Sequence, residues 1–153
     1  MTAQLHSAAG APWWVTMFTP FAKFLLAARV PLGFNGLITI RGRKSGLPRT
    51  TPVAIIDVAG RRWIWAPWGE VNWVRNLRAA GRATITVRGR KEEVGATELD
   101  EAERVIFFRD VLGSVARNIP FGVQFIRIAD QVDLNQPIEV ARDRRVFELH
   151  HLD

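Results

Sequence analysis

The sequence predicts an α+β fold in which antiparallel strands close into a small barrel with flanking helices. Short apolar, β-branched runs recur along the chain, and turns rich in Gly, Pro and Ser separate them, which is typical of hairpins. Segments with helical periodicity lie between pairs of these runs. A chain of 153 residues can bury one core without crosslinks. Chains with this arrangement close into small barrels.

The first 30 residues predict a flexible N-terminal segment and one helix. Residues 1–12 lack the pattern of a secretory signal, and residues 13–153 are expected to form a single domain. Thr19-Pro20 is a good helix start, which predicts a helix over residues 20–30. Its cations argue against a membrane span. Two interpretations stay open: a helix that packs over the barrel, or an interfacial helix on an anionic membrane.

The remaining elements are expected in hairpins with helices inserted between them. Asp100 is the expected N-cap of one helix, and Gly81 is the expected C-cap of another. About six strands result. The expected strands are 37–40, 53–58, 61–66, 83–87, 92–98 and 145–149, and the expected helices are 72–80, 100–113 and, less clearly marked, 121–128.

Composition excludes several kinds of chemistry. The chain has no cysteine, so disulfides, thiolate catalysis and Cys-based zinc sites are ruled out. The three histidines, His6, His150 and His151, all lie near the termini. His150 and His151 are neighbours on an expected strand and point to opposite faces. The sequence therefore predicts no metal site and no catalytic histidine.

The most informative stretch is residues 42–52, called the basic segment below. It carries Arg43, Lys44 and Arg49 together with two glycines and three hydroxyl residues. All of the formal net charge of +6 arises before Asp57, the first acidic residue. Successive N–H groups in a Gly-rich turn can hold an anion, so the segment predicts a phosphate or carboxylate site. A solubilising turn is the alternative, and the anionic partner could also be a nucleic acid or a membrane.

Aromatic residues follow the basic segment closely. Trp63 and Trp65 share one face of an expected strand, which predicts core packing. Trp68 and Trp73 lie where elements end, which suits the wall of a planar ligand. Basic residues among aromatics also suit single-stranded nucleic acid. However, the cations cluster on one loop, so nucleic-acid binding is not expected.

Three motifs in this order resemble one known family. They are Gly42-Arg43-Lys44-Ser45-Gly46-x-x-Arg49-x-x-Pro52, Ala66-Pro67-x-Gly69 and Asn72-Trp73-x-x-Asn76-Leu77-x-Ala79. Together they are similar to the deazaflavin-dependent nitroreductase and quinone reductase family, whose members bind coenzyme F420 on a split β-barrel. The likeness runs from about residue 13 to residue 98. It implies the FMN-binding split-barrel type of antiparallel fold.

The resemblance also implies roles for individual residues. The cofactor's phosphate and acidic tail would meet Arg43, Lys44 and Ser45, and its phosphate end would be closed by Asn72, Trp73 and Asn76. The deazaflavin ring would be lined by Arg49, Thr50, Thr51, Pro52, Val53, Ala66, Pro67, Trp68 and Gly69. As a separate hypothesis about the acceptor, we expect its pocket to comprise Trp14, Phe18, Trp68, Phe121 and Phe125. No catalytic side chain is expected, because the cofactor carries the chemistry.

The function expected from the resemblance is hydride transfer from reduced deazaflavin to a small acceptor, a quinone or a nitro compound. Some nitro-reducing relatives carry tyrosines over the substrate, whereas this chain has none, which favours a quinone. FMN in the same barrel is the runner-up cofactor, and a non-catalytic lipid- or tetrapyrrole-binding protein is the other alternative. The expected location is the cytoplasm, with the inner face of the cell membrane as the location left open. The sequence does not indicate the oligomeric state.

Overall fold

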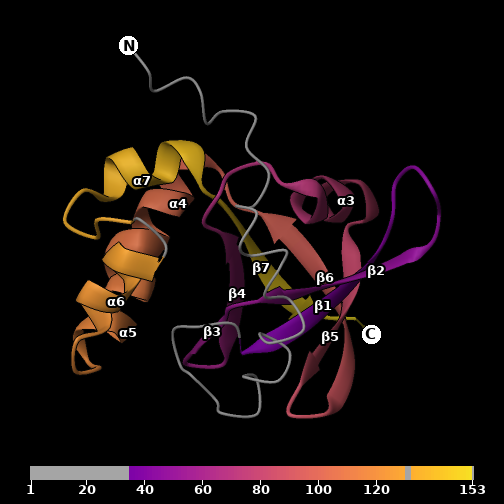
Figure 1. Ribbon diagram of the computed structural model, residues 1–153, viewed down its shortest axis with the longest axis horizontal. Coiled ribbons are helices and arrows are strands. Elements are labelled where there is room, and N and C mark those ends of the chain that lie inside the picture. The colour runs from indigo at the N-terminus through magenta and orange to yellow at the C-terminus, as the bar shows by residue number, and fades with distance from the viewer. Residues whose placement is uncertain (1–34, 130–131, 153) are drawn as a thin grey trace.

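The computed structural model describes residues 35–129 and 132–152 of the chain. The expected helix over residues 20–30, the N-terminal segment 1–12 and the pocket residues Trp14 and Phe18 lie outside these ranges. The described strands form one antiparallel sheet in the order β2-β1-β5-β6-β7-β4-β3 (Figure 1). The strands are β1 Gly36–Arg41, β2 Pro48–Val53, β3 Ile55–Val58, β4 Arg61–Ala66, β5 Arg82–Val87, β6 Arg90–Glu98 and β7 Arg145–His151.

The helices fall into two groups around this sheet. In Figure 1, α3 lies near β1 and β2, whereas α4, α5, α6 and α7 gather on the opposite side of the molecule. The helices are α3 Asn72–Ala80, α4 Glu101–Ile106, the π-helical turn η3 Phe107–Leu112, α5 Gly113–Arg117, α6 Gly122–Ala129 and α7 Pro137–Asp143.

The second strand is an element that the sequence analysis missed. Residues 48–52 were expected as part of a loop and Val53 as the start of the next strand, but β2 pairs with β1 from Pro48 opposite Arg41 to Val53 opposite Gly36. Two prolines in six residues obscured the strand. They are tolerated because β2 is an edge strand, where a missing N–H breaks no ladder. The basic segment is therefore a six-residue loop, 42–47, followed by a strand.

The expected strand 53–58 is likewise divided, and this division closes the barrel. β2 and β3 lie at opposite ends of the sheet order, yet only Ala54 separates them in the chain. The sheet must curl until its two edges meet at this residue. Asn35 secures the junction, since its side chain donates to the Ile55 carbonyl at 2.9 Å and accepts from the Ile55 N–H at 2.6 Å. The expected split β-barrel fold is confirmed.

Two hydrophobic cores lie on the two faces of this curled sheet. The barrel core contains Ile38, Ile64 and Phe147 and is covered by Val74 and Leu77 of α3. The second core lies under the helices of the other group and contains Trp63 and Trp65, which pack on Phe107 and Phe108. β4 alternates between the two cores, so its last four residues are all buried. The core prediction for both tryptophans is confirmed.

The helix after residue 100 begins as expected but continues further. Asp100 accepts from the Glu103 N–H, and Glu103 accepts from the Asp100 N–H, which forms a capping box. Gly113 was expected to end the helix, and this is wrong. Gly113 keeps helical dihedral angles, and helical structure continues through Arg117. The expected αL C-cap at Gly81 is confirmed by a φ of 70°.

Candidate functional site

The loop between β1 and β2 is held in a tight conformation by its own backbone. The Gly42 N–H donates to the Leu47 carbonyl at 2.8 Å, and the Gly46 N–H donates to the Gly42 carbonyl at 2.9 Å. Gly46 has a φ of 72°, which favours glycine. The Ser45 hydroxyl accepts from the Leu47 N–H at 3.2 Å. The N–H groups of Lys44 and Ser45 have no acceptor among the described residues, so the loop presents two free donors.

A pair of hydrogen bonds fixes this loop to helix α3. The Asn76 side-chain oxygen accepts from the Arg43 N–H at 3.2 Å and from the Arg43 guanidinium at 2.8 Å. Asn76 is 7% exposed and is one of two buried polar or charged side chains in the described ranges. The sequence analysis placed Asn76 beside the cofactor phosphate. In the structure its amide positions Arg43, and the neutral acceptor leaves the positive charge of that residue unbalanced.

The charge of the basic segment is not neutralised by any described carboxylate. Arg41, Arg43, Lys44 and Arg49 are exposed, and no described acidic group lies within ion-pair distance of them. Elsewhere many arginines are paired with carboxylates; Arg61, for example, contacts Glu148 at 2.7 Å. The segment therefore forms a local positive surface that suits an anion.

Arg41 belongs to this surface, although the sequence analysis did not assign it to the site. A Cβ atom placed on Gly46 would lie 3.6 Å from the Arg41 guanidinium, so this cation folds over the loop. Its position at the end of β1, opposite Pro48, explains the proximity. Arg41 could have been predicted from the sequence, because it directly precedes Gly42, the first glycine of the motif.

The residues expected to line the ring form the edge strand β2. Thr50 and Thr39 share a hydrogen bond between their hydroxyl groups, with 2.8 Å between the oxygens. Thr51 and Pro52 are half-buried, and Val53 is buried in the barrel core. Because β2 ends the sheet order, one row of its backbone N–H and C=O groups lies outside the ladder. A planar ligand could use that row.

The turn between β4 and α3 carries the second group of expected ring contacts. Ala66 is buried, whereas Pro67, Trp68 and Gly69 are half-buried. Gly69 has a φ of 80°, and its carbonyl accepts from the Val71 N–H at 3.0 Å. Trp68 packs against the barrel core, so part of its side-chain surface already contacts the protein.

Helix α3 begins without a side-chain cap. Val71 stands at the N-cap, so the N–H groups of the first turn receive no side-chain acceptor. Asn72 is exposed at this helix start. Trp73 is half-buried and its ring lies 6.2 Å from that of Phe147. Trp73 therefore packs on the barrel, while Asn72 is free to contact a ligand.

The opposite end of α3 is anchored by a charged network. Arg78 donates to Glu98 at 2.7 Å and to Glu70 at 2.9 Å, and Arg145 contacts Glu70 at 3.3 Å. The hydrogen bond from Arg78 lowers the pKa of Glu98 below its usual range. This network ties α3 to β6 and β7, so the helix that holds Arg43 is itself fixed.

The expected acceptor-pocket phenylalanines are not brought to the basic segment. Phe121 is 81% exposed, with a φ of 61°, on the turn between α5 and α6, and Phe125 lies in α6. α5 packs on η3 and α6 packs on α5, on the side of the molecule away from β2 and α3 (Figure 1). Of the expected pocket residues that the structure describes, Trp68 alone lies close to the expected ring contacts.

Two features are absent from residues 35–129 and 132–152. No group of three or more His, Asp or Glu side chains is arranged to hold a metal ion. No helix in these ranges has the length and apolarity needed to cross a bilayer.

Comparison with protein families gives a match over residues 26–122 to the F420H(2)-dependent quinone reductase family. The match covers more than half of the chain and includes the basic segment, the 66–69 turn and α3. The chain belongs to this family. It is an oxidoreductase, and its cofactor is coenzyme F420. A comparison with curated protein sequences gave no match.

Solved structures share the fold at low sequence identity. A conserved hypothetical protein from Mycobacterium tuberculosis is 18% identical with a TM-score of 0.52, covering 88% of this chain and 79% of its own. A protein described as a candidate 5-nitroimidazole antibiotic resistance protein from Bacteroides thetaiotaomicron VPI-5482 is 12% identical with a TM-score of 0.51. That match covers 74% of this chain and 70% of the other. At these identities the likeness supports the split-barrel fold alone.

The residues of the basic segment fit a phosphorylated, acidic cofactor. The surface offers four exposed cations, two N–H groups without an acceptor in the described ranges and the Ser45 hydroxyl, and the sequence has no acidic residue before Asp57. Gly42 permits the close approach: a Cβ there would lie 2.8 Å from the Ser45 hydroxyl oxygen. A side chain at position 42 would require the Ser45 hydroxyl to move and the Leu47 carbonyl, 3.2 Å from that Cβ, to shift slightly.

Proposed function

We propose that this chain reduces a quinone with reduced F420 and that the basic segment holds the phosphate and acidic tail of the cofactor. The observation that carries the proposal is the unneutralised cation surface fixed to α3 by the Arg43–Asn76 hydrogen bonds. A loop that is already ordered loses less entropy when it binds. Lys44, Ser45 and Arg49 are the other proposed contacts, and Arg41 joins them.

The proposed ring site lies between the outer edge of β2 and the 66–69 turn. Backbone groups of Thr50, Thr51, Pro52 and Val53 offer the polar contacts of an edge strand. Trp68 and the uncapped start of α3, with Asn72, close the other side. The half-buried Trp68 ring excludes water from one face of the ring site, which protects a hydride in transfer.

Bound F420 supplies the hydride, so the chain needs no nucleophile or metal of its own. The work of the protein is to bind and orient the cofactor and to keep the acceptor against it. The proposed acceptor is a quinone, which is supported by the printed description of the family. The absence of tyrosine from the chain gives the site no phenol for a nitro group.

Contact with an anionic membrane surface through residues 13–30 is the second part of the proposal. It is supported by the aromatic and cationic composition of that stretch, and a membrane-held quinone would be reached from such a position. Sedimentation with phosphatidylglycerol vesicles, compared with phosphatidylcholine vesicles, tests this. Equal amounts of protein pelleting with both would contradict it.

The double variant Arg43→Ala/Lys44→Ala tests the cation site directly. Loss of two charge-assisted contacts is expected to weaken F420 binding roughly 100-fold, at about 1.5 kcal/mol each. The matched control is Arg117→Ala/Arg142→Ala, which removes two exposed cations from the helices of the other group. Unchanged F420 affinity in the first variant, or an equal loss in both, would refute the assignment.

A further inference from the structure

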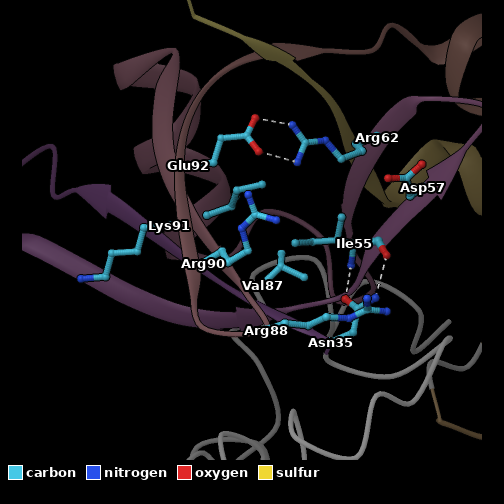
Figure 2. Close-up of a pocket in the computed structure, with 10 residues that line it drawn as sticks. Asn35, Ile55, Asp57, Arg62, Val87, Arg88, Arg90, Lys91 and Glu92 are labelled. Carbon is cyan, nitrogen blue, oxygen red and sulfur yellow. Dashed lines mark hydrogen bonds and ion pairs between the residues drawn. The ribbon is translucent and has the colours of Figure 1, made fainter.

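A pocket of about 550 Å³ opens beside the turn between β5 and β6 (Figure 2). The antiparallel register places this turn at the end of the barrel opposite to loop 42–47. It is lined by Asn35, which precedes β1, whereas the loop follows β1. The six residues of that strand separate the two places by about 20 Å along the strand, at 3.3 Å per residue. An anion in this pocket is therefore distinct from the proposed phosphate contacts.

The floor of the pocket is apolar. Ile55, Ile85 and Val87 line it and also pack in or against the barrel core. The volume falls within the range of small-molecule sites, which combine an apolar lining with a few placed polar groups. A ligand for this pocket would carry an apolar part of modest size.

The rim of the pocket carries more positive than negative charge. Four cations, Arg62, Arg88, Arg90 and Lys91, face two carboxylates, Asp57 and Glu92. Figure 2 shows Lys91 directed away, which still leaves an excess of one positive charge.

Glu92 does not neutralise the other rim cations. It is held in a two-bond ion pair with Arg62, at 2.6 and 3.1 Å. The hydrogen bond from Arg62 is the main cause of its lowered pKa, and the charge of Arg90 adds a smaller effect. Arg90 therefore lies near Glu92 without a described ion pair, and it keeps its capacity to bind an anion.

The turn that carries Arg88 has an unusual sequence for its geometry. Arg88 and Gly89 have φ angles of 52° and 79° and join β5 to β6, with Val87 opposite Arg90. Such two-residue hairpins favour Asn-Gly or Asp-Gly, and a longer side chain at positive φ is strained. Arginine is thus not the residue that local folding prefers here. Figure 2 shows its side chain running along the pocket toward Asn35.

We propose that this pocket binds a small organic anion, a carboxylate with a short apolar body. Arg88, on the side of Asn35, and Arg90, on the side of Glu92, supply the positive charge that attracts the carboxylate, and Ile55, Ile85 and Val87 contact the apolar part. Asn35 is occupied by its bonds to Ile55 and shapes the wall. The site is independent of the basic segment, so it adds a second ligand class to a reductase whose acceptor and cofactor bind elsewhere.

The test compares sodium decanoate with decyltrimethylammonium, which has the same apolar chain and the opposite charge. Calorimetry measures affinity, and methyl NMR spectra of the full chain locate the site. We expect decanoate to bind, to shift the methyl signals of Ile55 and Val87, and to bind more tightly than the cation. No binding, equal binding of the cation, or binding without these shifts would overturn the proposal.

The variant Arg88→Asn/Arg90→Gln should lower decanoate affinity about tenfold, since the pocket loses two positive charges. Asn at position 88 suits the turn, so the fold is expected to persist, and F420 affinity serves as the check on folding. The control Arg117→Gln/Arg142→Gln removes the same charge elsewhere and should keep decanoate affinity. Equal affinity in both variants would contradict the site.

Discussion

Replacing Asn76 tests whether the ordered loop matters for cofactor binding. Asn76→Ala removes the oxygen that accepts from the Arg43 N–H at 3.2 Å and from its guanidinium at 2.8 Å. Because Arg43 is partly exposed, we expect the loss of one neutral and one charge-assisted hydrogen bond to lower the free energy of unfolding by about 2 kcal/mol. The freed loop must then be ordered by the ligand, which costs about 0.5–1.5 kcal/mol per side chain and weakens F420 binding roughly threefold to tenfold.

Two matched variants separate the effect of loop order from the effect of the charge beside Arg43. Asn72→Ala lies on the same helix, is exposed, and loses no hydrogen bond within the described ranges, so stability should stay within about 0.5 kcal/mol. Asn76→Asp keeps an acceptor for Arg43 but balances its charge. We expect it to retain much of the loop order and still to weaken F420 binding, because the positive surface loses one charge.

Urea unfolding followed by tryptophan fluorescence gives the stability, and titration with F420 gives the affinity. The reasoning fails if Asn76→Ala binds F420 as tightly as the unaltered chain while its stability falls. It also fails if Asn72→Ala and Asn76→Ala lose the same stability.

Three further predictions concern the scaffold. Trp65→Ala should lose about 3–5 kcal/mol in urea unfolding, because the side chain is 2% exposed and packs on Phe108. Arg104→Met should lose about 2–4 kcal/mol in the same assay, since two buried carbonyls would lose their donors at 2.7 and 3.0 Å. The pKa of Glu92 is lowered by Arg62, so this pair stabilises the fold above the unfolded pKa of about 4.3 and stops doing so as pH falls through the lower folded pKa. Arg62→Gln should therefore lower Tm at pH 7 and have a smaller effect at pH 3; an equal effect at both would contradict the sign.

The sequence predicted most of the barrel because its signals were local. Alternating apolar residues marked β1, β4 and β5, and the Asp100 capping box marked the start of α4. β2 was missed because Pro48 and Pro52 are usual in turns, and only the sheet order shows that this strand lies at an edge. The closure at Ala54 is also a property of the whole sheet, so no local pattern revealed it.

The candidate site was predicted in part for the same reason. Exposed cations in a Gly-rich turn are visible in the chain, and the structure keeps Arg43, Lys44 and Arg49 unneutralised by described carboxylates. Asn76 can bind Arg43 because α3 packs against β1. The spacing of residues in the sequence does not predict that packing. Phe121 was assigned to the acceptor pocket together with the expected helix over residues 121–128, although the fold places its turn with the other helices.

The most direct measurement is a fluorescence titration of the purified chain with F420 and, separately, with FMN, repeated on Arg43→Ala/Lys44→Ala. The account predicts saturable, selective quenching by F420 that weakens roughly 100-fold in the double variant. Binding of FMN alone, or F420 binding that the double variant leaves unchanged, would contradict the claim that the basic segment holds the deazaflavin cofactor.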